Sequence, residues 1–295
     1  MERNICKILI GNEQGTVFFC KIPFPDLNNM LPVFITTNSI INNEILYEDN
    51  VIIEINIEKE NKTRKLNLCN RMKYTNEEYD ITIIKIKNED EINNFLELDD
   101  DIINDIINNV NNNKNYIDET IYIIQYPKGK LSVSYGVLDN IYEDTKYFFN
   151  HRSSTEGGSS GAPILNTNNK LIGVHKEGYN NKVTFLNYPL KEIIQFYTEK
   201  KLLQEFNTKY KLNITDTNIT QLNLIVYEIG DEELKDLCKM GFKELKELNL
   251  SNNNISDIKV LEKINFEKLE LLNLDNNKIS DINVLEKVNF IFSFK

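Results

Sequence analysis

Short apolar runs, several of them closed by a glycine, a proline or an asparagine, follow one another through the first two-thirds of the chain. Ile5–Ile10 stops at Gly11, and Thr16–Ile22 stops at Pro23. Val51–Ile57 alternates apolar and polar residues, as a half-buried strand does. Further runs of this kind lie at 31–41, 80–87, 120–125, 131–137, 170–175 and 183–187. Many short strands without regular helices between them predict a mainly β fold, an antiparallel barrel or sandwich.

Two stretches interrupt this strand pattern. Asn88–Asn115 is acidic and rich in asparagine, so we expect a long connection with room for only a short helix. Leu190–Phe206 carries an apolar stripe between charged residues, which is the pattern of an amphipathic helix. We expect this helix to end a first domain, which spans residues 1–207.

The last part of the chain contains an internal repeat with a period of roughly 24 residues. Leu245-Lys-Glu-Leu-Asn-Leu-Ser-Asn-Asn-Asn-Ile-Ser-Asp-Ile recurs as Leu269-Glu-Leu-Leu-Asn-Leu-Asp-Asn-Asn-Lys-Ile-Ser-Asp-Ile. A weaker unit with Ile219, Leu222 and Leu224 precedes these two copies. The repeat defines a second domain over residues 208–295, in which each unit packs on its neighbours.

The repeated spacing resembles the leucine-rich-repeat pattern L-x-x-L-x-L-x-x-N-x-I. That resemblance implies a small α/β solenoid with one short strand per unit on a concave face, and with Asn253 and Asn277 bonding the backbone as a ladder. It also implies a protein partner for the concave face. The chain ends at 291–295 without a polar cap, so three alternatives stay open: a truncated array, docking on the first domain, or association with a partner.

Composition narrows the class of protein further. The 295 residues are enough for about two domains, and the 41% of hydrophobic residues can bury a core. The net charge of -11 argues against nucleic acid and anionic membrane surfaces as main partners. The four cysteines form no Cys-x-x-Cys pair and no cluster with the two histidines, so no metal site and no cofactor are expected. With no secretory signal and no apolar run of about 18 residues in length, we expect a cytoplasmic protein with reduced thiols.

The run Ser154-Thr-Glu-Gly-Gly-Ser-Ser-Gly-Ala-Pro163 makes a poor helix and a poor strand. A sharp loop of this composition holds one serine forward and aims backbone N–H groups at one point, which is what acyl transfer requires. The candidate nucleophile is Ser160, and the candidate oxyanion donors are the amides of Gly158 and Ser160. The alternative is a plain Gly/Ser surface turn.

Three stretches together resemble the trypsin-like serine proteases. Gly158-Ser-Ser-Gly-Ala-Pro163 is similar to their Gly-x-Ser-Gly-Gly/Ala-Pro loop, and Asp80-Ile-Thr-Ile-Ile84 is similar to their acid strand. Gly15-Thr-Val-Phe-Phe19 is similar to their opening strand, less one glycine. The resemblance covers about residues 3–200 and implies two six-stranded barrels with the site between them. It also implies that Asp80 is the acid of a triad and Ser160 its nucleophile.

The base of this triad departs from the family's pattern. The family carries it in Thr-Ala-Ala-His, and the matching run is Ile35-Thr-Thr-Asn-Ser-Ile40, which puts Ser39 at the base position. Neither Ser39 nor Asn38 accepts a proton near pH 7, and loss of the histidine costs on the order of a million-fold in turnover. We therefore expect an inactive or weakly active peptidase homologue that binds peptides or proteins, with Asp80 bonding Ser39 or nearby amides.

A second resemblance concerns the pocket for the residue before the scissile bond. Ile172-Gly-Val-His175 is similar to the Gly-Ile-His strand of glutamyl endopeptidases and picornaviral cysteine proteases, and Thr155 to their pocket threonine. It implies that Thr155 and His175 together bond a Glu or Gln side chain. The alternatives are a buried histidine satisfied by backbone and an ordinary turn threonine. For His151 an exposed or structural histidine is expected.

Two other functions stay open. The chain is an active intracellular serine endopeptidase with a Glu or Gln preference if water, His151 or His175 replaces the base. Alternatively, the repeats alone carry the function and the barrels serve as their scaffold. Secreted family members are activated when a new N-terminus pairs with an acid before the serine, and Ser159 stands at that position, so this activation is not expected.

Overall fold

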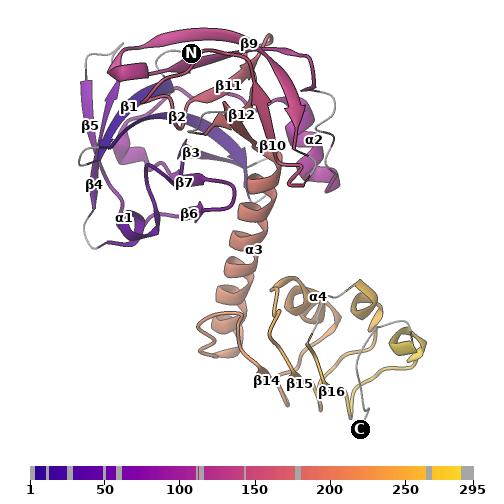
Figure 1. The fold of residues 1–295 in the computed structure, drawn as a ribbon. Coiled ribbons are helices and arrows are strands. Elements are labelled where there is room, and N and C mark those ends of the chain that lie inside the picture. Colours follow the sequence, from indigo (N-terminus) through magenta and orange to yellow (C-terminus); the bar gives the residue numbers. More distant parts are fainter. Residues whose placement is uncertain are drawn as a thin grey trace. The chain divides into compact units, whose positions relative to one another are not determined.

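The structure is a computed structural model that describes residues 4–10, 13–24, 29–48, 51–57, 62–110, 112, 116–142, 144–176, 181–263 and 268–286. The chain folds into two compact units, Met1–Ile194 and Gln195–Lys295 (Figure 1). The boundary between them falls inside helix α3, Asn187–Tyr210, and the predicted boundary after residue 207 falls inside the same helix.

The first sheet of unit 1 contains seven strands in the order β5-β4-β1-β2-β3-β7-β6, all antiparallel to their neighbours. The strands are β1 Ile5–Ile10, β2 Glu13–Pro23, β3 Met30–Thr36, β4 Ile52–Ile57, β5 Lys62–Asn67, β6 Lys73–Asn76 and β7 Ile81–Lys85. The alternation in β4 places Ile53, Ile55 and Ile57 in the core and the residues between them in solvent. A short helix α1, Asn43–Tyr47, follows β3 and is capped at its N-terminus by Asn42, whose Oδ1 accepts the Ile45 amide at 3.0 Å.

The second sheet of unit 1 closes into a barrel of six strands in the order β10-β13-β12-β11-β8-β9. The strands are β8 Thr120–Gln125, β9 Ser132–Ile141, β10 Phe148–His151, β11 Pro163–Asn166, β12 Leu171–His175 and β13 Lys182–Phe185. Every residue of β11 and β12 is buried. The prediction of a mainly β fold with two barrel-like sheets is confirmed, although the first sheet has seven strands in place of six.

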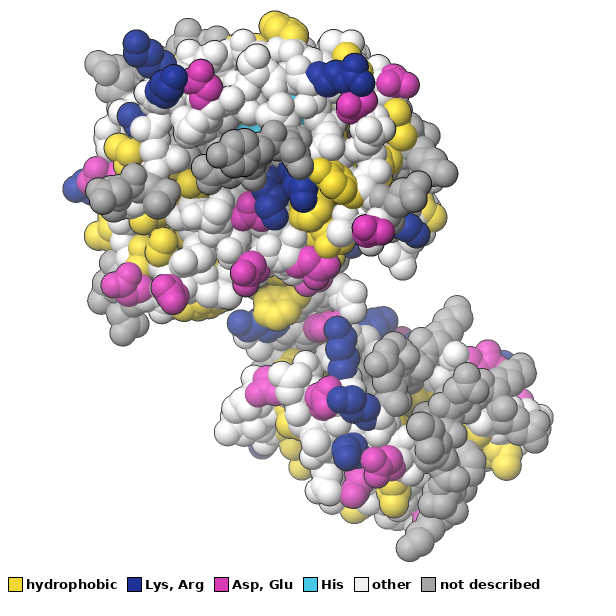
Figure 2. Space-filling model, viewed as in Figure 1, with side chains coloured by type: hydrophobic (Ala, Val, Ile, Leu, Met, Phe, Trp, Pro, Cys, Tyr) yellow, Lys and Arg dark blue, Asp and Glu magenta, His cyan; other side chains and the backbone are white. Residues whose placement is uncertain are grey.

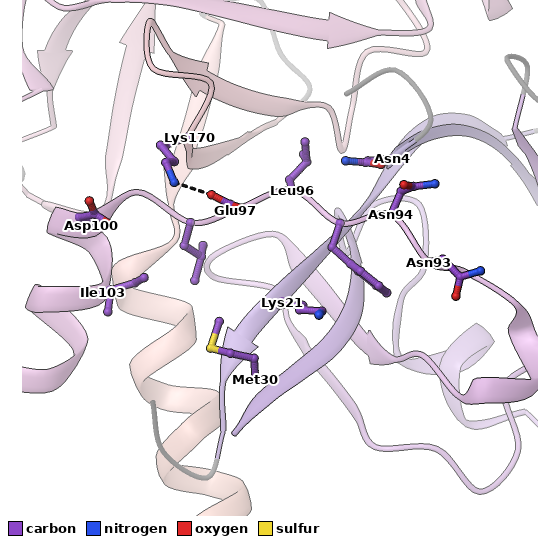
Figure 3. A pocket seen from close by; sticks show the side chains of 12 residues that line it. Asn4, Lys21, Met30, Asn93, Asn94, Leu96, Glu97, Asp100, Ile103 and Lys170 are labelled. Carbon is purple, nitrogen blue, oxygen red and sulfur yellow. Dashed lines mark hydrogen bonds and ion pairs between the residues drawn. The ribbon is translucent and has the colours of Figure 1, made fainter. Parts of the chain in front are cut away.

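A connection between the two sheets carries helix α2, Asp100–Asn108, as the acidic stretch predicted. The Leu96 amide donates to the Phe19 carbonyl at 2.8 Å, and the Leu171 amide donates to the Glu97 carbonyl at 2.8 Å. The connection therefore pairs with β2 on one side and with β12 on the other. A hollow of about 540 Å³ is lined by residues of this connection. Figure 3 shows its lining side chains, among them Lys170 bonded to Glu97. None of the predicted site residues lines this hollow.

Unit 2 contains three parallel strands in the order β14-β15-β16, with bounds Gln221–Asn223, Glu247–Asn249 and Leu271–Asn273. Leu222, Leu248 and Leu272 lie in register, and all three point into one apolar core. The weak unit around Leu222 is therefore a third repeat, as the spacing predicted. Helix α4, Asp231–Lys239, and the 3-10 turns Lys259–Lys263 and Asn283–Glu286 complete the described part of the unit. The end of the array, residues 287–295, lies outside the described residues.

The two ladder asparagines bond the backbone as predicted. Asn253 Oδ1 accepts the amides of Tyr227 and Ile229 at 3.1 and 3.0 Å, and its Nδ2 donates to the Leu224 carbonyl at 2.7 Å. Asn277 repeats this pattern one unit later, with Nδ2 donating to the Leu250 carbonyl at 2.9 Å. Each carboxamide thus ties its own repeat to the preceding one.

No described helix has the length and apolar character needed to span a membrane. The four cysteines all lie in the described residues, and none of them forms a disulfide.

Candidate active site

The serine loop between β10 and β11 has a backbone that only glycine permits at two positions. Gly158 has a φ of +97° and Gly161 a φ of +84°, both in the left-handed region. A Cβ at Gly158 would clash with the Tyr126 carbonyl oxygen, and one at Gly161 would clash with the Thr16 carbonyl oxygen. The loop is therefore a turn with fixed geometry, and its second half, residues 159–163, is buried.

Residues of the loop itself hold it in place. The Ser159 amide donates to the Glu156 carbonyl at 3.0 Å, and the Glu156 amide donates back to Ser159 Oγ at 3.2 Å. The Ala162 amide donates to the Ser159 carbonyl at 3.0 Å. Ser159 is 1% exposed, and its side chain and backbone together close the loop.

The loop is anchored to both sheets of unit 1. On the side of β2, the Thr16 amide donates to the Ser160 carbonyl at 2.8 Å, and Thr16 Oγ1 donates to the Gly158 carbonyl at 2.9 Å. On the side of β12, the Gly161 amide donates to the His175 carbonyl at 2.9 Å. Ser160 thus sits where the two sheets meet, which is the position that the sequence implied.

The Ser160 side chain is 5% exposed, and its hydroxyl makes no hydrogen bond within the described part of the chain. The amides of Gly158 and Ser160, the predicted oxyanion donors, also have no acceptor among the described residues.

Asp80 lies at the start of β7 in a left-handed conformation, with a φ of +49°, and is 7% exposed. Its Oδ1 accepts the backbone amide of Ser39 at 2.8 Å, so the expected bond between these residues is confirmed. Ser39 itself is exposed in the turn after β3, and its hydroxyl donates to Thr37 Oγ1 at 3.0 Å. The second carboxylate oxygen, Asp80 Oδ2, lies 3.9 Å from Lys176 Nζ.

Gly15 on β2 brings the Ser39 turn and the serine loop together. A Cβ at Gly15 would lie 2.8 Å from the side chain of Ile40 and 3.2 Å from the carbonyl oxygen of Ser160. Both segments therefore pack on the same glycine, and a side chain there would separate them. This contact explains why a glycine stands at that point of the opening strand.

The two histidines of the chain contact each other inside the barrel. His151 Nε2 lies 3.1 Å from His175 Nδ1, and the Ser153 amide donates to His151 Nδ1 at 3.1 Å. Because Nδ1 of His151 accepts, its proton sits on Nε2 and is donated to His175, whose own proton is then on Nε2. Only traces of cyan reach the surface in Figure 2, in agreement with an exposure of 3% for each imidazole.

Burial keeps both imidazoles neutral. Removal from water lowers the pKa of His151 to about 4. The same effect, with a smaller contribution from His151, lowers the pKa of His175 to about 3. His151 is therefore a structural histidine, one of the two alternatives considered from the sequence. His175 is buried and bonded by a side chain, where the sequence alternative had named backbone.

Thr155 joins the same hydrogen-bond network. Its hydroxyl donates to Asn181 Oδ1 at 2.6 Å, and Asn181 Nδ2 donates to the Ser153 carbonyl at 3.1 Å. The network therefore runs from Thr155 through Asn181 and Ser153 to His151 and His175. The Thr155 proton is used inside the chain, and its oxygen lone pairs remain for a ligand.

Lys176 is the site residue that sequence reasoning missed. It directly follows His175, and along a strand successive side chains point to opposite faces. That alternation was the available signal, because it aims Lys176 away from the histidine pair. Its ammonium lies 3.9 Å from Asp80 Oδ2 and 4.8 Å from the centre of the Phe148 ring. Among the described residues, no group of three or more metal-ligating side chains was found.

Comparison with known proteins gives two family matches. The trypsin-like peptidase domain family matches residues 33–174, and the leucine-rich-repeat family, in two copies, matches residues 243–287. No curated protein matches the chain. Ser39, Asp80, Thr155 and Ser160 all lie inside the first match.

Several solved structures are similar to the chain. A crystal structure of Deg5 is 14% identical with a TM-score of 0.48, and covers 65% of this chain and 87% of its own. A Glu endopeptidase in complex with MPD is 16% identical with a TM-score of 0.47, and covers 66% and 90%. The serine endoprotease from Yersinia pestis is 13% identical with a TM-score of 0.46, and covers 66% and 64%.

Proposed function

Because the chain carries a trypsin-like peptidase domain followed by leucine-rich repeats, we propose that its first unit is a peptidase homologue without a catalytic base that binds peptides. The observation that carries this proposal is the hydrogen bond from the Ser39 amide to Asp80 Oδ1 at 2.8 Å. In a working triad the acid orients an imidazole, and here the residue that the acid holds carries only a hydroxyl. A serine hydroxyl takes no proton from Ser160 at neutral pH.

Neither histidine is a substitute base in this proposal. His151 and His175 bond each other, and their lowered pKa values of about 4 and about 3 make them poor acceptors at pH 7. Within the described residues, neither imidazole bonds Ser160 Oγ. The loop and the two free amides remain, and they suit the binding of a peptide carbonyl without its cleavage.

The ligand's side chain is a glutamine in this proposal. His175 Nε2–H is a neutral donor, and Thr155 Oγ1 is an acceptor because its proton goes to Asn181. A carboxamide offers one oxygen to the imidazole and one N–H to the threonine. A carboxylate offers acceptors alone, so it would face the threonine lone pairs and meet no positive charge. We therefore narrow the implied Glu or Gln preference to Gln.

The repeats add a protein-binding surface in this proposal. Asn223, Asn249 and Asn273 lie in register on adjacent strands. Each Oδ1 accepts the backbone amide two residues further along its own chain, at 3.3, 3.1 and 2.9 Å in that order. The three NH₂ groups have no acceptor among the described residues, so they form a row of donors for a partner.

The absence of a disulfide at any of the four cysteines supports a reducing, cytoplasmic location.

A fluorophosphonate probe tests the missing base directly. We expect no labelling of the wild-type protein at neutral pH, because Ser160 has no group to take its proton. The Ser160→Ala variant is the control for labelling at other sites. Strong labelling of the wild type that Ser160→Ala removes would contradict the proposal and favour the active endopeptidase.

Fluorescence anisotropy with a pair of labelled peptides, differing only in one Gln or Glu, tests the ligand. We expect the Gln peptide to bind about tenfold more tightly, as one satisfied hydrogen bond predicts. Thr155→Val should reduce this preference, whereas Thr155→Ser keeps the oxygen and should retain it. Equal binding of both peptides, or tighter binding of the Glu peptide, would contradict the assignment.

A further inference from the structure

Lys176 lies beside the carboxylate that a catalytic histidine would need. Asp80 Oδ1 is occupied by the Ser39 amide at 2.8 Å, and Oδ2 lies 3.9 Å from Lys176 Nζ. We propose that the Lys176 ammonium has replaced the histidine as the charged partner of Asp80, and that this ion pair prevents the site from using a histidine base. The inference rests on the proposed loss of the base at Ser39.

The backbone places Lys176 at the edge of the serine loop. The preceding residue exchanges hydrogen bonds with that loop, since the His175 amide donates to the Ala162 carbonyl at 2.8 Å and the Gly161 amide donates to His175. The Lys176 amide donates to the Lys182 carbonyl at 2.8 Å. These bonds fix the start of the Lys176 side chain, which is 24% exposed and lies against the Phe148 ring.

Four influences act on the Lys176 ammonium. Burial lowers its pKa most, Asp80 and Glu77 act to raise it, and Lys182 acts to lower it. The Lys176 ammonium is therefore partly buried, and burying it without the Asp80 carboxylate as a partner would cost free energy. Lys176 is not itself a base for Ser160, because no hydrogen bond joins Nζ to Ser160 Oγ within the described residues.

An ammonium beside Asp80 opposes a histidine base by simple electrostatics. A histidine that takes the serine proton becomes a cation, and the acid normally stabilises that cation. With Lys176 present, the new cation meets a like charge, and the Asp80 carboxylate already has an ammonium as its partner. An ammonium a few ångströms away lowers the pKa of an imidazole by about one unit. Restoring the histidine is therefore insufficient unless the lysine is also removed.

The test compares Ser39→His with the double variant Ser39→His/Lys176→Met. We expect fluorophosphonate labelling of Ser160 to be at least about fivefold faster in the double variant, and its pH profile to shift up by about one unit. Nuclear magnetic resonance titration of the introduced imidazole should show the same shift. Lys176→Arg keeps the charge and should behave as the single variant. Lys182→Met in the Ser39→His background removes a second lysine that contacts the same Phe148 ring, and it should shift the imidazole pKa by much less than Lys176→Met.

Several results would overturn the inference. These are equal imidazole pKa values with and without Lys176, a Lys182→Met effect as large as that of Lys176→Met, or no labelling in the double variant. Thermal unfolding of each variant verifies that the fold is intact. If the wild type is labelled and Lys176→Met abolishes labelling, the lysine is a base and both proposals fail. If the wild type is labelled and Lys176→Met has no effect on it, the proposed function fails while the pKa comparison still tests the ion pair.

Discussion

Two imidazoles that stay neutral inside a barrel make the stability of unit 1 depend on pH. His151 and His175 have folded pKa values of about 4 and about 3, below the ordinary value of 6.5. The unfolded chain binds protons on both residues as the pH falls below 6.5, while the folded chain does not. The stability due to neutral burial is therefore complete above pH 6.5 and is lost as the pH falls from there through the folded pKa values of about 4 and about 3.

Urea unfolding at pH 7 and pH 5 measures this loss. We expect each imidazole to contribute a decrease on the order of 1–2 kcal/mol in unfolding free energy at the lower pH. Carboxylates titrate over part of the same pH range, so their contribution must be measured separately. The control is the double variant His151→Gln/His175→Gln, which lacks both imidazoles. A decrease of the same size in that variant would contradict the assignment.

The residues of the site were predictable to different degrees. Sequence reasoning placed Ser39 against Asp80 because both lie in motifs with a fixed order along the chain, and the hydrogen bond between them exists. The contact between Asp80 and Lys176 was not predictable, because it joins the end of β12 to the start of β7 across the fold. The histidine pair was missed for the same reason, since β13 separates β10 from β12 in the barrel.

At the scale of elements, the serine loop depends on its left-handed glycines. Gly161→Ala places a methyl group against the Thr16 carbonyl oxygen at a φ of +84°, so the loop must move or strain. We expect a loss of about 2 kcal/mol or more in unfolding free energy, measured by urea titration. Gly157→Ala is the matched control, because nothing lies within 4 Å of its Cβ position, and it should cost less than about 0.5 kcal/mol. Similar costs for the two variants would mean that the loop is adaptable.

The apolar pattern predicted the strands that carry many buried apolar residues, and it missed one strand that is charged and one that is very short. β1, β4 and β7 carry enough buried apolar residues to be visible in the sequence. β5, Lys62–Asn67, is an edge strand with charged side chains, and its stability comes from backbone pairing with β4. β10, Phe148–His151, is only four residues long, too short for a periodic signal.

At the scale of the whole molecule, the second unit depends on single side chains that join its repeats. Asn253 is 7% exposed and bonds backbone groups of both its own and the preceding repeat. Asn253→Ala leaves those buried groups unpaired, so we expect a loss of about 3 kcal/mol or more in the unfolding free energy of this unit. Circular dichroism of the full chain in urea measures it. The neighbouring Asn254 is exposed, and Asn254→Ala should be nearly neutral.

Asn253→Ala should cost more unfolding free energy than Asn254→Ala, because only the Asn253 side chain bonds two repeats. If both substitutions cost the same, the ladder bonds contribute little and apolar packing alone stabilises the array. The core leucines of three repeats would then be the sole source of stability, as for any small solenoid.

The connection between the two sheets of unit 1 has a consequence for how the unit opens. Because Leu96 bonds β2 and the adjacent Glu97 bonds β12, the two sheets cannot move apart at this point without breaking one of these hydrogen bonds. The two sheets therefore form one cooperative unit in amide hydrogen exchange, with the Leu96 and Leu171 amides exchanging as slowly as the barrel core. A peptide bound where the sheets meet would by mass action slow exchange throughout both sheets.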